Sequence, residues 1–150
     1  MTTAPSIQRI ADELEIRNLL GELTYLADTA TDEQLERYLS LFTEDATWAV
    51  ISDGVALASQ ERAGRQAILE GAQQRRASGA QGPGSGTRHA LHTIHVRFDS
   101  DDEAYALCYW HYYKGSSSDR PVLAAMGEYR NRLVRTKDGW RLARRELVQG

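Results

Sequence analysis

Apolar residues recur at helical spacing over the first part of the chain. The segment 7–27 places an apolar side chain every three or four residues, which predicts an amphipathic helix with Ser6 as its cap. Thr31 and Gln34 match a capping box, so a second helix is expected to begin there. A third helix is predicted over 65–77. The stripe of the first helix consists of Ile16, Leu19, Leu20, Leu23, Leu26 and Ala27.

After the second helix the pattern changes to that of β-strands. A polar break at 43–45 precedes a strand over 46–51, and residues 55–58 are expected to return as a short second strand. Four longer strands with hairpin-length connections follow the third helix. Because helices and strands are segregated along the chain, their order favours an α+β fold over a doubly wound parallel sheet. The longer strands are expected at Thr87–Asp99, Tyr105–Lys114, Val122–Val134 and Trp140–Val148.

Length and charge limit the classes of protein to which this chain can belong. The 150 residues fit one domain spanning 1–150, and the formal net charge of -3 gives no positive field for a nucleic acid. No apolar run approaches membrane-spanning length, and the N-terminus lacks the features of a signal or transit peptide. The single Cys108 excludes an internal disulfide. A cytoplasmic protein that binds neither nucleic acid nor membrane is therefore expected.

A glycine-rich segment, Ser78–Gly86, separates the third helix from the long strands. It follows a helix and leads into a strand, which is the reverse of the order in a phosphate-binding loop. Two interpretations stay open for this segment: a plain connector, or a lid over the mouth of a pocket.

Two kinds of residue indicate chemistry. Asp28 closes the last turn of the first helix, where the helix dipole disfavours a carboxylate, so it is either a solvated acid in a linker or a functional group. His89, His92 and His95 share one predicted strand, and histidine exchanges protons near neutral pH. Three histidines could hold zinc, but no carboxylate lies at a familiar spacing from them, so no metal is expected.

Strict alternation divides the side chains of the long strands between two faces. It places His92 with Ile94 on the more apolar face and His89 on the other face. In the next strand it places Trp110 and Tyr112 together. The aromatic residues of this strand are explained either by core packing and an oligomer interface, or by a pocket for an apolar ligand.

Three short motifs occur at 41–46, 64–68 and 138–145. They resemble the end of the second helix, the entry into the third helix and the final hairpin of SnoaL-like proteins in the nuclear transport factor two-like superfamily. Their order and spacing extend the resemblance from Ile7 to Val148. It implies a cone-shaped, curved, mixed and mostly antiparallel sheet that wraps with three helices around a pocket. It says less about activity, because this fold hosts many functions.

Within that superfamily the layout is most similar to scytalone dehydratase and hexachlorocyclohexane dehydrochlorinase, which are lyases with an Asp–His pair. The resemblance places Asp28 on the family aspartate and His89 on the family base. It therefore conflicts with the alternation that favours His92, and a bulge near Leu91 would reconcile the two. The second catalytic histidine of the dehydratase has no clear equivalent, although Lys114 or His111 falls near it. The pocket lysine of the dehydrochlorinase falls on Leu23, and its pocket arginine falls near Glu146.

The resemblance implies a small-molecule lyase or isomerase that needs neither a metal nor an organic cofactor. In it, His89 takes a proton from carbon on an apolar, cyclic or aromatic substrate, and Asp28 orients the imidazole. The alternatives are a polyketide cyclase, or a non-catalytic binding or assembly module like the small subunit of aromatic-ring dioxygenases. The oligomeric states common in this family suggest a homodimer or homotrimer. The residues expected to bind the substrate are Tyr25, Trp48, His92, Trp110 and Tyr112, with the hydroxyl of Tyr25 or Tyr112 on a substrate oxygen.

Overall fold

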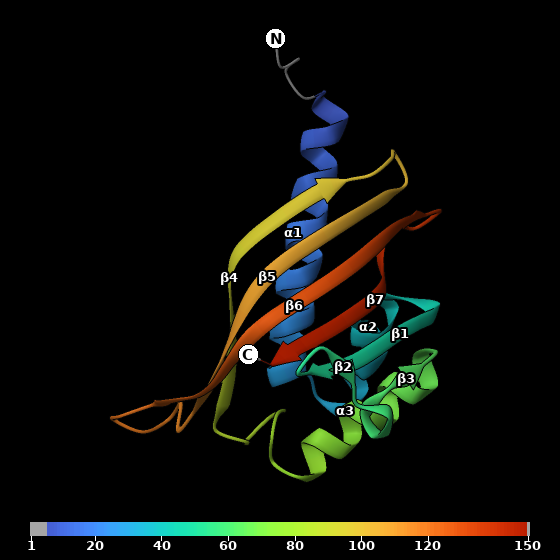
Figure 1. Cartoon of the computed structure of the whole chain (residues 1–150). Coiled ribbons are helices and arrows are strands. Elements are labelled where there is room, and N and C mark those ends of the chain that lie inside the picture. Colours follow the sequence, from blue (N-terminus) through green and yellow to red (C-terminus); the bar gives the residue numbers. More distant parts are fainter. Residues whose placement is uncertain (1–5, 150) are drawn as a thin grey trace.

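The computed structural model describes residues 6–149 (Figure 1). Within that range it has the predicted α+β cone, with three α-helices and a curved, mixed sheet of seven strands. The strand order is β2-β1-β7-β6-β5-β4, and β3 pairs with β1. Among the strands of residues 6–149, only β1 and β7 pair in parallel. The elements are α1 (Ile7–Thr29), α2 (Leu35–Ser40), α3 (Arg65–Ala77), β1 (Phe42–Ser52), β2 (Val55–Ala56), β3 (Arg62–Ala63), β4 (Thr87–Phe98), β5 (Glu103–Lys114), β6 (Val122–Thr136) and β7 (Gly139–Gln149).

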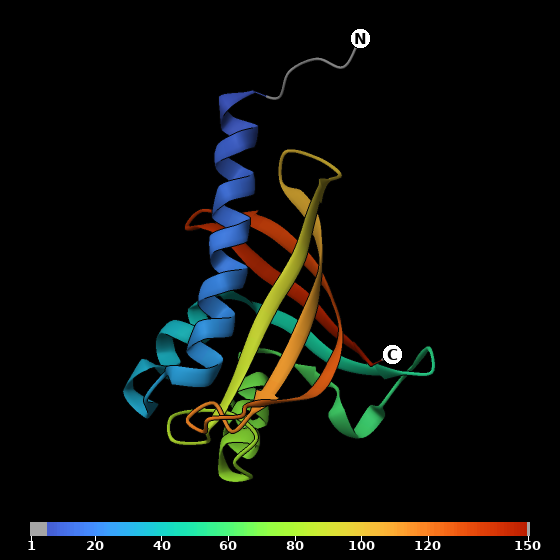
Figure 2. The same cartoon turned by 90° about the vertical axis from the view of Figure 1, so that its left-hand side faces the viewer.

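The long helix α1 stands against the inner side of the curved sheet (Figure 2). Its predicted apolar stripe is buried except for Ala27, which is half-buried, and Ile16 and Leu20 are fully shielded from solvent. These side chains join Leu133, Trp140 and Leu142 of the sheet in one apolar core, which fixes the helix on the sheet because apolar area leaves water. None of the helices within residues 6–149 is long and apolar enough to cross a membrane.

The region after α1 differs from its prediction in one respect. The capping box is confirmed, since Gln34 Oε1 accepts a hydrogen bond from the Thr31 backbone N–H at 3.0 Å, and a short 3-10 turn leads into α2. The predicted break at 43–45 is wrong, because these residues lie inside β1, which begins at Phe42. The register of β1 against β7 shifts between Phe42 and Thr47. At such an irregularity a strand can include polar residues without ending.

Two further irregularities change which side chains face the inside of the cone. The register of β4 against β5 shifts between His92 and His95, and Thr93 has a positive φ of 51°. The register of β7 against β6 shifts so that Ala143 has no partner. Because an extra residue reverses the alternation of a strand, the side chains before and after each shift follow opposite phases. In each of these two strands, the residues that face inward before the shift and those that face inward after it are therefore separated by an odd number of positions.

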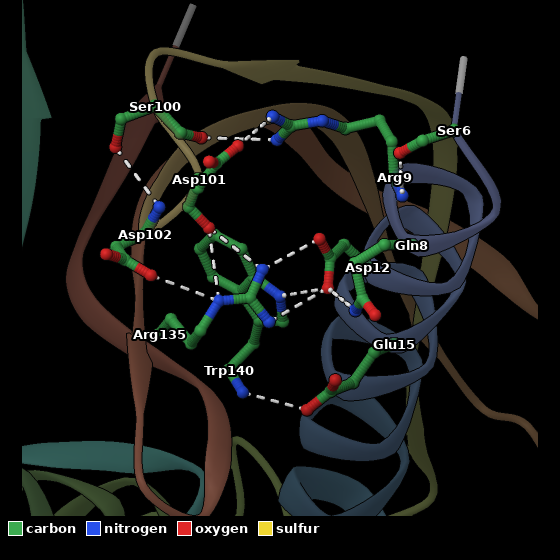
Figure 3. Close-up of polar contacts among 10 residues, drawn as sticks. All are labelled: Ser6, Gln8, Arg9, Asp12, Glu15, Ser100, Asp101, Asp102, Arg135 and Trp140. Carbon is green, nitrogen blue, oxygen red and sulfur yellow. Dashed lines mark hydrogen bonds and ion pairs between the residues drawn. The ribbon is translucent and has the colours of Figure 1, made fainter.

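A partly buried ion pair fastens the first half of α1 to the sheet (Figure 3). The Asp12 carboxylate accepts hydrogen bonds from Arg135 Nη1 and Nη2, at 3.0 and 2.7 Å, and from Trp140 Nε1 at 3.2 Å. The Arg135 guanidinium also lies 4.8 Å from the centre of the Trp140 ring. The Arg135 hydrogen bonds hold the pKa of Asp12 at about 2, below its ordinary 3.8, against the opposing effect of burial. The carboxylate is therefore ionised at all physiological pH values.

Candidate functional site

Near the C-terminal end of α1, the inner face of the sheet leaves a cavity of about 220 Å³. Helices α1, α2 and α3 and strands β1, β4, β6 and β7 supply most of its walls. This volume is small beside that of most drug-sized sites, so it suits a compact ligand of one or two rings. The residues that line the cavity are Leu23, Thr24, Ala27, Tyr38, Trp48, Val50, Gln60, Arg75, Gln81, His89, Tyr129, Arg145, Leu147 and Gln149.

His89 and Asp28 meet at the edge of this cavity. Asp28 Oδ1 lies 2.7 Å from His89 Nδ1, and Asp28 Oδ2 accepts a hydrogen bond from the backbone N–H of His89 at 2.6 Å. The side chain of Asp28 is buried, with 3% exposed, and that of His89 is 16% exposed. Since both carboxylate oxygens bind the same residue, the imidazole is held in position. In the neutral ring Nδ1–H donates to the carboxylate, which leaves the lone pair of Nε2 free to accept a proton.

The side chain of His89 faces the cavity because of the bulge in β4. The bulge that was expected near Leu91 occurs at Thr93, two residues further along. Strict alternation counted back from Ile94 therefore gives the wrong face for His92. His92 is exposed on the outer side of the sheet, where its ring lies 4.4 Å from that of His111, and it does not line the cavity. The prediction that His92 binds substrate is corrected on this ground.

Two of the expected substrate-binding residues belong to the first half of the chain. Trp48 of β1 lines the cavity, and the Arg75 guanidinium lies 4.9 Å from the centre of its indole ring. Tyr25 of α1 does not line this cavity; it is 67% exposed and lines a separate pocket of about 350 Å³, which Asp28 and His89 also line. The expectation that Tyr25 binds substrate therefore stays a prediction.

The other two belong to β5 and support the site without lining it. The ring of Tyr112 lies 4.9 Å from that of His89, and its hydroxyl donates to the Ala80 carbonyl at 2.8 Å. This bond engages the hydroxyl that was expected to bind a substrate oxygen. Trp110 faces inward as predicted but is buried against Tyr129, with ring centres 5.8 Å apart. Both side chains therefore pack against residues that line the cavity, Tyr112 against His89 and Trp110 against Tyr129.

Two arginines line the cavity and were not predicted from the sequence. The Nε of Arg145 donates to Asn131 Oδ1 at 2.8 Å, and the side chain is buried. The Nε of Arg75 donates to Gln81 Oε1 at 3.0 Å, and Gln81 belongs to the glycine-rich segment. That segment thus forms part of the wall, while its role as a lid stays a prediction. The inward position of Arg145 follows from the shift at Ala143, since strict alternation would place Arg144 inside.

The histidines of β4 do not gather around one point. Within residues 6–149, no group of three or more His, Cys, Asp or Glu side chains is placed to hold a metal ion. The chemistry available to the cavity therefore starts from one imidazole, its carboxylate partner and two guanidinium groups.

Replacing Thr93 with glycine is expected to leave the site intact. A β-branched residue at positive φ is strained, and glycine adopts that conformation without strain. We expect the free energy of unfolding to rise by up to about 1 kcal/mol in urea denaturation. Glycine at the exposed His95 of the same strand should instead lower it by about 0.5–1 kcal/mol. A loss of stability at Thr93 as large as that at His95 would contradict the role of this residue in the bulge.

Comparison with known proteins agrees with this architecture. The model of the SnoaL-like domain family matches residues 8–146. Among functionally curated proteins, none matches the chain. A solved NTF2-like protein with a cystatin-like fold from Novosphingobium aromaticivorans is 27% identical, with a TM-score of 0.72, and the match covers 98% of this chain and 92% of that one.

Two further solved structures come from the same organism. A proposed aromatic ring hydroxylase is 25% identical, with a TM-score of 0.74, and the match covers 98% of this chain and 92% of that one. A proposed scytalone dehydratase is 19% identical, with a TM-score of 0.67, and the match covers 95% and 87% of the two chains. At this identity the last similarity shows a shared fold alone.

Proposed function

Because the chain belongs to the SnoaL-like domain family, which the match over residues 8–146 shows, we propose that its cavity is an active site. We propose a cofactor-independent lyase or isomerase that acts on a small, largely apolar ring compound. The observation that carries this proposal is the contact of 2.7 Å between His89 Nδ1 and Asp28 Oδ1 at the cavity edge. It supplies an oriented general base without any further rearrangement.

The proposed reaction begins with transfer of a proton from carbon to His89. The substrate C–H bond beside a carbonyl breaks, the proton moves to Nε2, and the Asp28 carboxylate stabilises the imidazolium that forms. In the lyase case the electron pair forms a C=C bond as a β-hydroxyl leaves, and the imidazolium proton converts the leaving hydroxide to water. In the isomerase case the same proton returns to a different carbon. Both outcomes balance without an added reagent.

The carbonyl oxygen of the substrate needs a donor as negative charge develops on it. Since the hydroxyl of Tyr112 is engaged by Ala80 and Tyr25 lies outside the cavity, this role passes to other tyrosines. Tyr38 and Tyr129 line the cavity on the sides of α2 and β6. Either phenol would serve as the donor in this proposal.

Hydrogen exchange into a ketone tests the proton-transfer step. The probe is α-tetralone in D₂O, whose exchange at the carbon beside the carbonyl is followed by proton NMR, together with its β-hydroxy derivative, which loses water to give naphthol. We expect the protein to accelerate both reactions. Rates equal to those in buffer for both compounds would overturn the proposed function.

Two alternatives use the same cavity. A non-catalytic binding or assembly module needs no contact between His89 and Asp28, and its pocket would be filled by its own aromatic side chains. The cavity is open and the contact is formed, which supports an enzyme. A polyketide cyclase would use the same residues on a larger substrate, and the small volume favours the lyase or isomerase.

We also propose that the protein forms a homo-oligomer through the outer face of β5 and β6. Exposed apolar side chains gather there in what we call the outer patch, and a salt bridge between Glu128 and Arg130 at 2.6 Å keeps its edge neutral. Two copies can therefore meet on this face without repulsion between like charges. The outer patch consists of Leu107, Tyr109, Leu123 and Met126.

A charge in the outer patch is expected to abolish this association. Light scattering after size-exclusion chromatography should give two or three times the chain mass of 16.8 kDa for the unaltered protein, and the single-chain mass for Met126→Glu. Val55 is as exposed but lies on β2, so Val55→Glu serves as the control and should keep the larger mass. A single-chain mass for the unaltered protein would exclude this interface.

A further inference from the structure

Arg145 is a buried cation whose hydrogen-bonding capacity is only partly used. Its side chain is 5% exposed, and its guanidinium lies 4.2 Å from the centre of the Tyr129 ring. Nε is bound to Asn131, while Nη2 is buried and has no hydrogen-bond partner. Arginine stays charged in proteins, and an unpaired buried charge is costly. Arg145 lines the cavity, so an anionic group of a ligand bound there can pair with its guanidinium charge.

Arg75 brings a second guanidinium to the same cavity. The Trp48 ring and Gln81 hold it in place, which leaves its terminal nitrogens available. No aspartate or glutamate among the described residues lines the cavity, and within 6–149 neither guanidinium forms an ion pair. Asp28, behind His89, supplies one negative charge against two positive ones. The side chains of the site therefore carry an excess of positive charge.

The neighbours of Arg145 do not supply the missing anion. Burial raises the pKa of the Tyr129 phenol, and the opposing effect of Arg145 is smaller. Burial likewise raises the pKa of the Cys108 thiol. Both groups are neutral at physiological pH, so the positive charge of Arg145 is balanced neither by a phenolate nor by a thiolate.

We propose that the cavity binds a substrate with a carboxylate group, which Arg145 and Arg75 hold while its ring lies against Trp48. The planar fork of a guanidinium matches the two oxygens of a carboxylate, and both are most effective when water is excluded. The rest of the lining combines apolar and aromatic side chains with polar ones, which matches a ring that bears this anionic group. This proposal rests on the proposed function, because the bound carboxylate compound is a substrate only if the protein is an enzyme. The carboxylate would anchor the ring and bring a carbon–hydrogen bond to His89 Nε2.

Binding of naphthoate, compared with the neutral naphthamide of the same shape, tests this proposal by isothermal titration calorimetry. We expect naphthoate to bind at least about tenfold more tightly than naphthamide, because hydrogen bonds to charged groups are stronger. Arg145→Met and Arg75→Met should each weaken naphthoate binding by about tenfold or more and leave naphthamide binding unchanged. Equal affinities for the two compounds would overturn the proposal.

Two further variants and a check of folding make the result decisive. Arg144 lies next to Arg145 on β7 but is exposed and bonded to Glu146, so Arg144→Met should bind naphthoate normally. Because Arg145 also holds Asn131, thermal melting checks that its variant folds, and Arg75→Met, which leaves that contact untouched, carries the test if it does not. His89→Ala should still bind naphthoate. Loss of catalysis and loss of carboxylate binding are thereby separate results, and unchanged binding in Arg75→Met and in a folded Arg145→Met would refute the arginine site.

Discussion

Replacing His89 with alanine is expected to lower kcat/KM for the β-hydroxy derivative of α-tetralone by about a hundred- to ten-thousand-fold, the usual contribution of positioned proton transfer. The loss should fall on kcat, since the ring of the substrate still has Trp48 and the apolar wall to bind. Naphthol formation gives the rate directly. His92→Ala is the matched control, because this histidine lies on the same strand but outside the cavity. Equal losses in the two variants, or none in His89→Ala, would exclude His89 as the base.

Asparagine at position 28 tests the orientation of the imidazole rather than its presence. The backbone N–H of His89 would bind the amide oxygen of the new side chain, so that its NH₂ group faces Nδ1. Nδ1 must then accept, and the proton moves to Nε2, where the base needs a lone pair. We therefore expect a loss of kcat similar to that of His89→Ala, with the tautomer identified by the nitrogen chemical shifts of the imidazole. A fully active Asp28→Asn with unchanged shifts would show that the carboxylate does not set the tautomer.

The fold was predictable because each of its elements is written in a local pattern. The apolar stripe predicts α1, and the predicted bounds of the third helix, 65–77, match those of α3. Burial of one face is sufficient to specify such an element, and turn-forming residues separate the strands. The polar run at 43–45 misled the prediction because its place inside a strand depends on the parallel pairing of β1 with β7, which is a contact between distant parts of the chain.

The site was less predictable because it depends on the phase of two strands. Because β4 contains a single extra residue, His89 faces the cavity and His92 does not. An extra residue in β7 likewise places Arg145 inside in place of Arg144. Neither bulge contains the glycine that commonly marks such a position, and Thr93 is a residue type that disfavours its own φ. Asp28 was identifiable for a different reason, since a carboxylate at the C-terminal end of a helix is electrostatically unfavourable and needs a partner. The family resemblance supplied that partner where alternation did not.

Asp12→Asn is expected to lower the free energy of unfolding at neutral pH by about 2–3 kcal/mol. A pKa held at about 2 in place of 3.8 corresponds to roughly 2 kcal/mol of stabilisation, and loss of one member of a partly buried pair adds to this. Arg135 keeps contacts with Asp101 and Asp102, so the variant should still fold. Urea denaturation measures the difference. Asp101→Asn, which removes a carboxylate that is 92% exposed, is the control and should change stability by less than about 0.5 kcal/mol.

The pH dependence distinguishes the charge of Asp12 from its packing. Because the folded protein lowers this pKa, the unfolded chain takes up the proton first as the pH falls. The stabilisation is therefore complete above about pH 4 and is lost as the pH falls towards 2. The difference in unfolding free energy between the unaltered protein and Asp12→Asn should shrink by about 2 kcal/mol over that interval. If the difference stays constant with pH, Asp12 stabilises α1 on the sheet by its shape and hydrogen-bond count, and the charge that joins it to Arg135 contributes nothing.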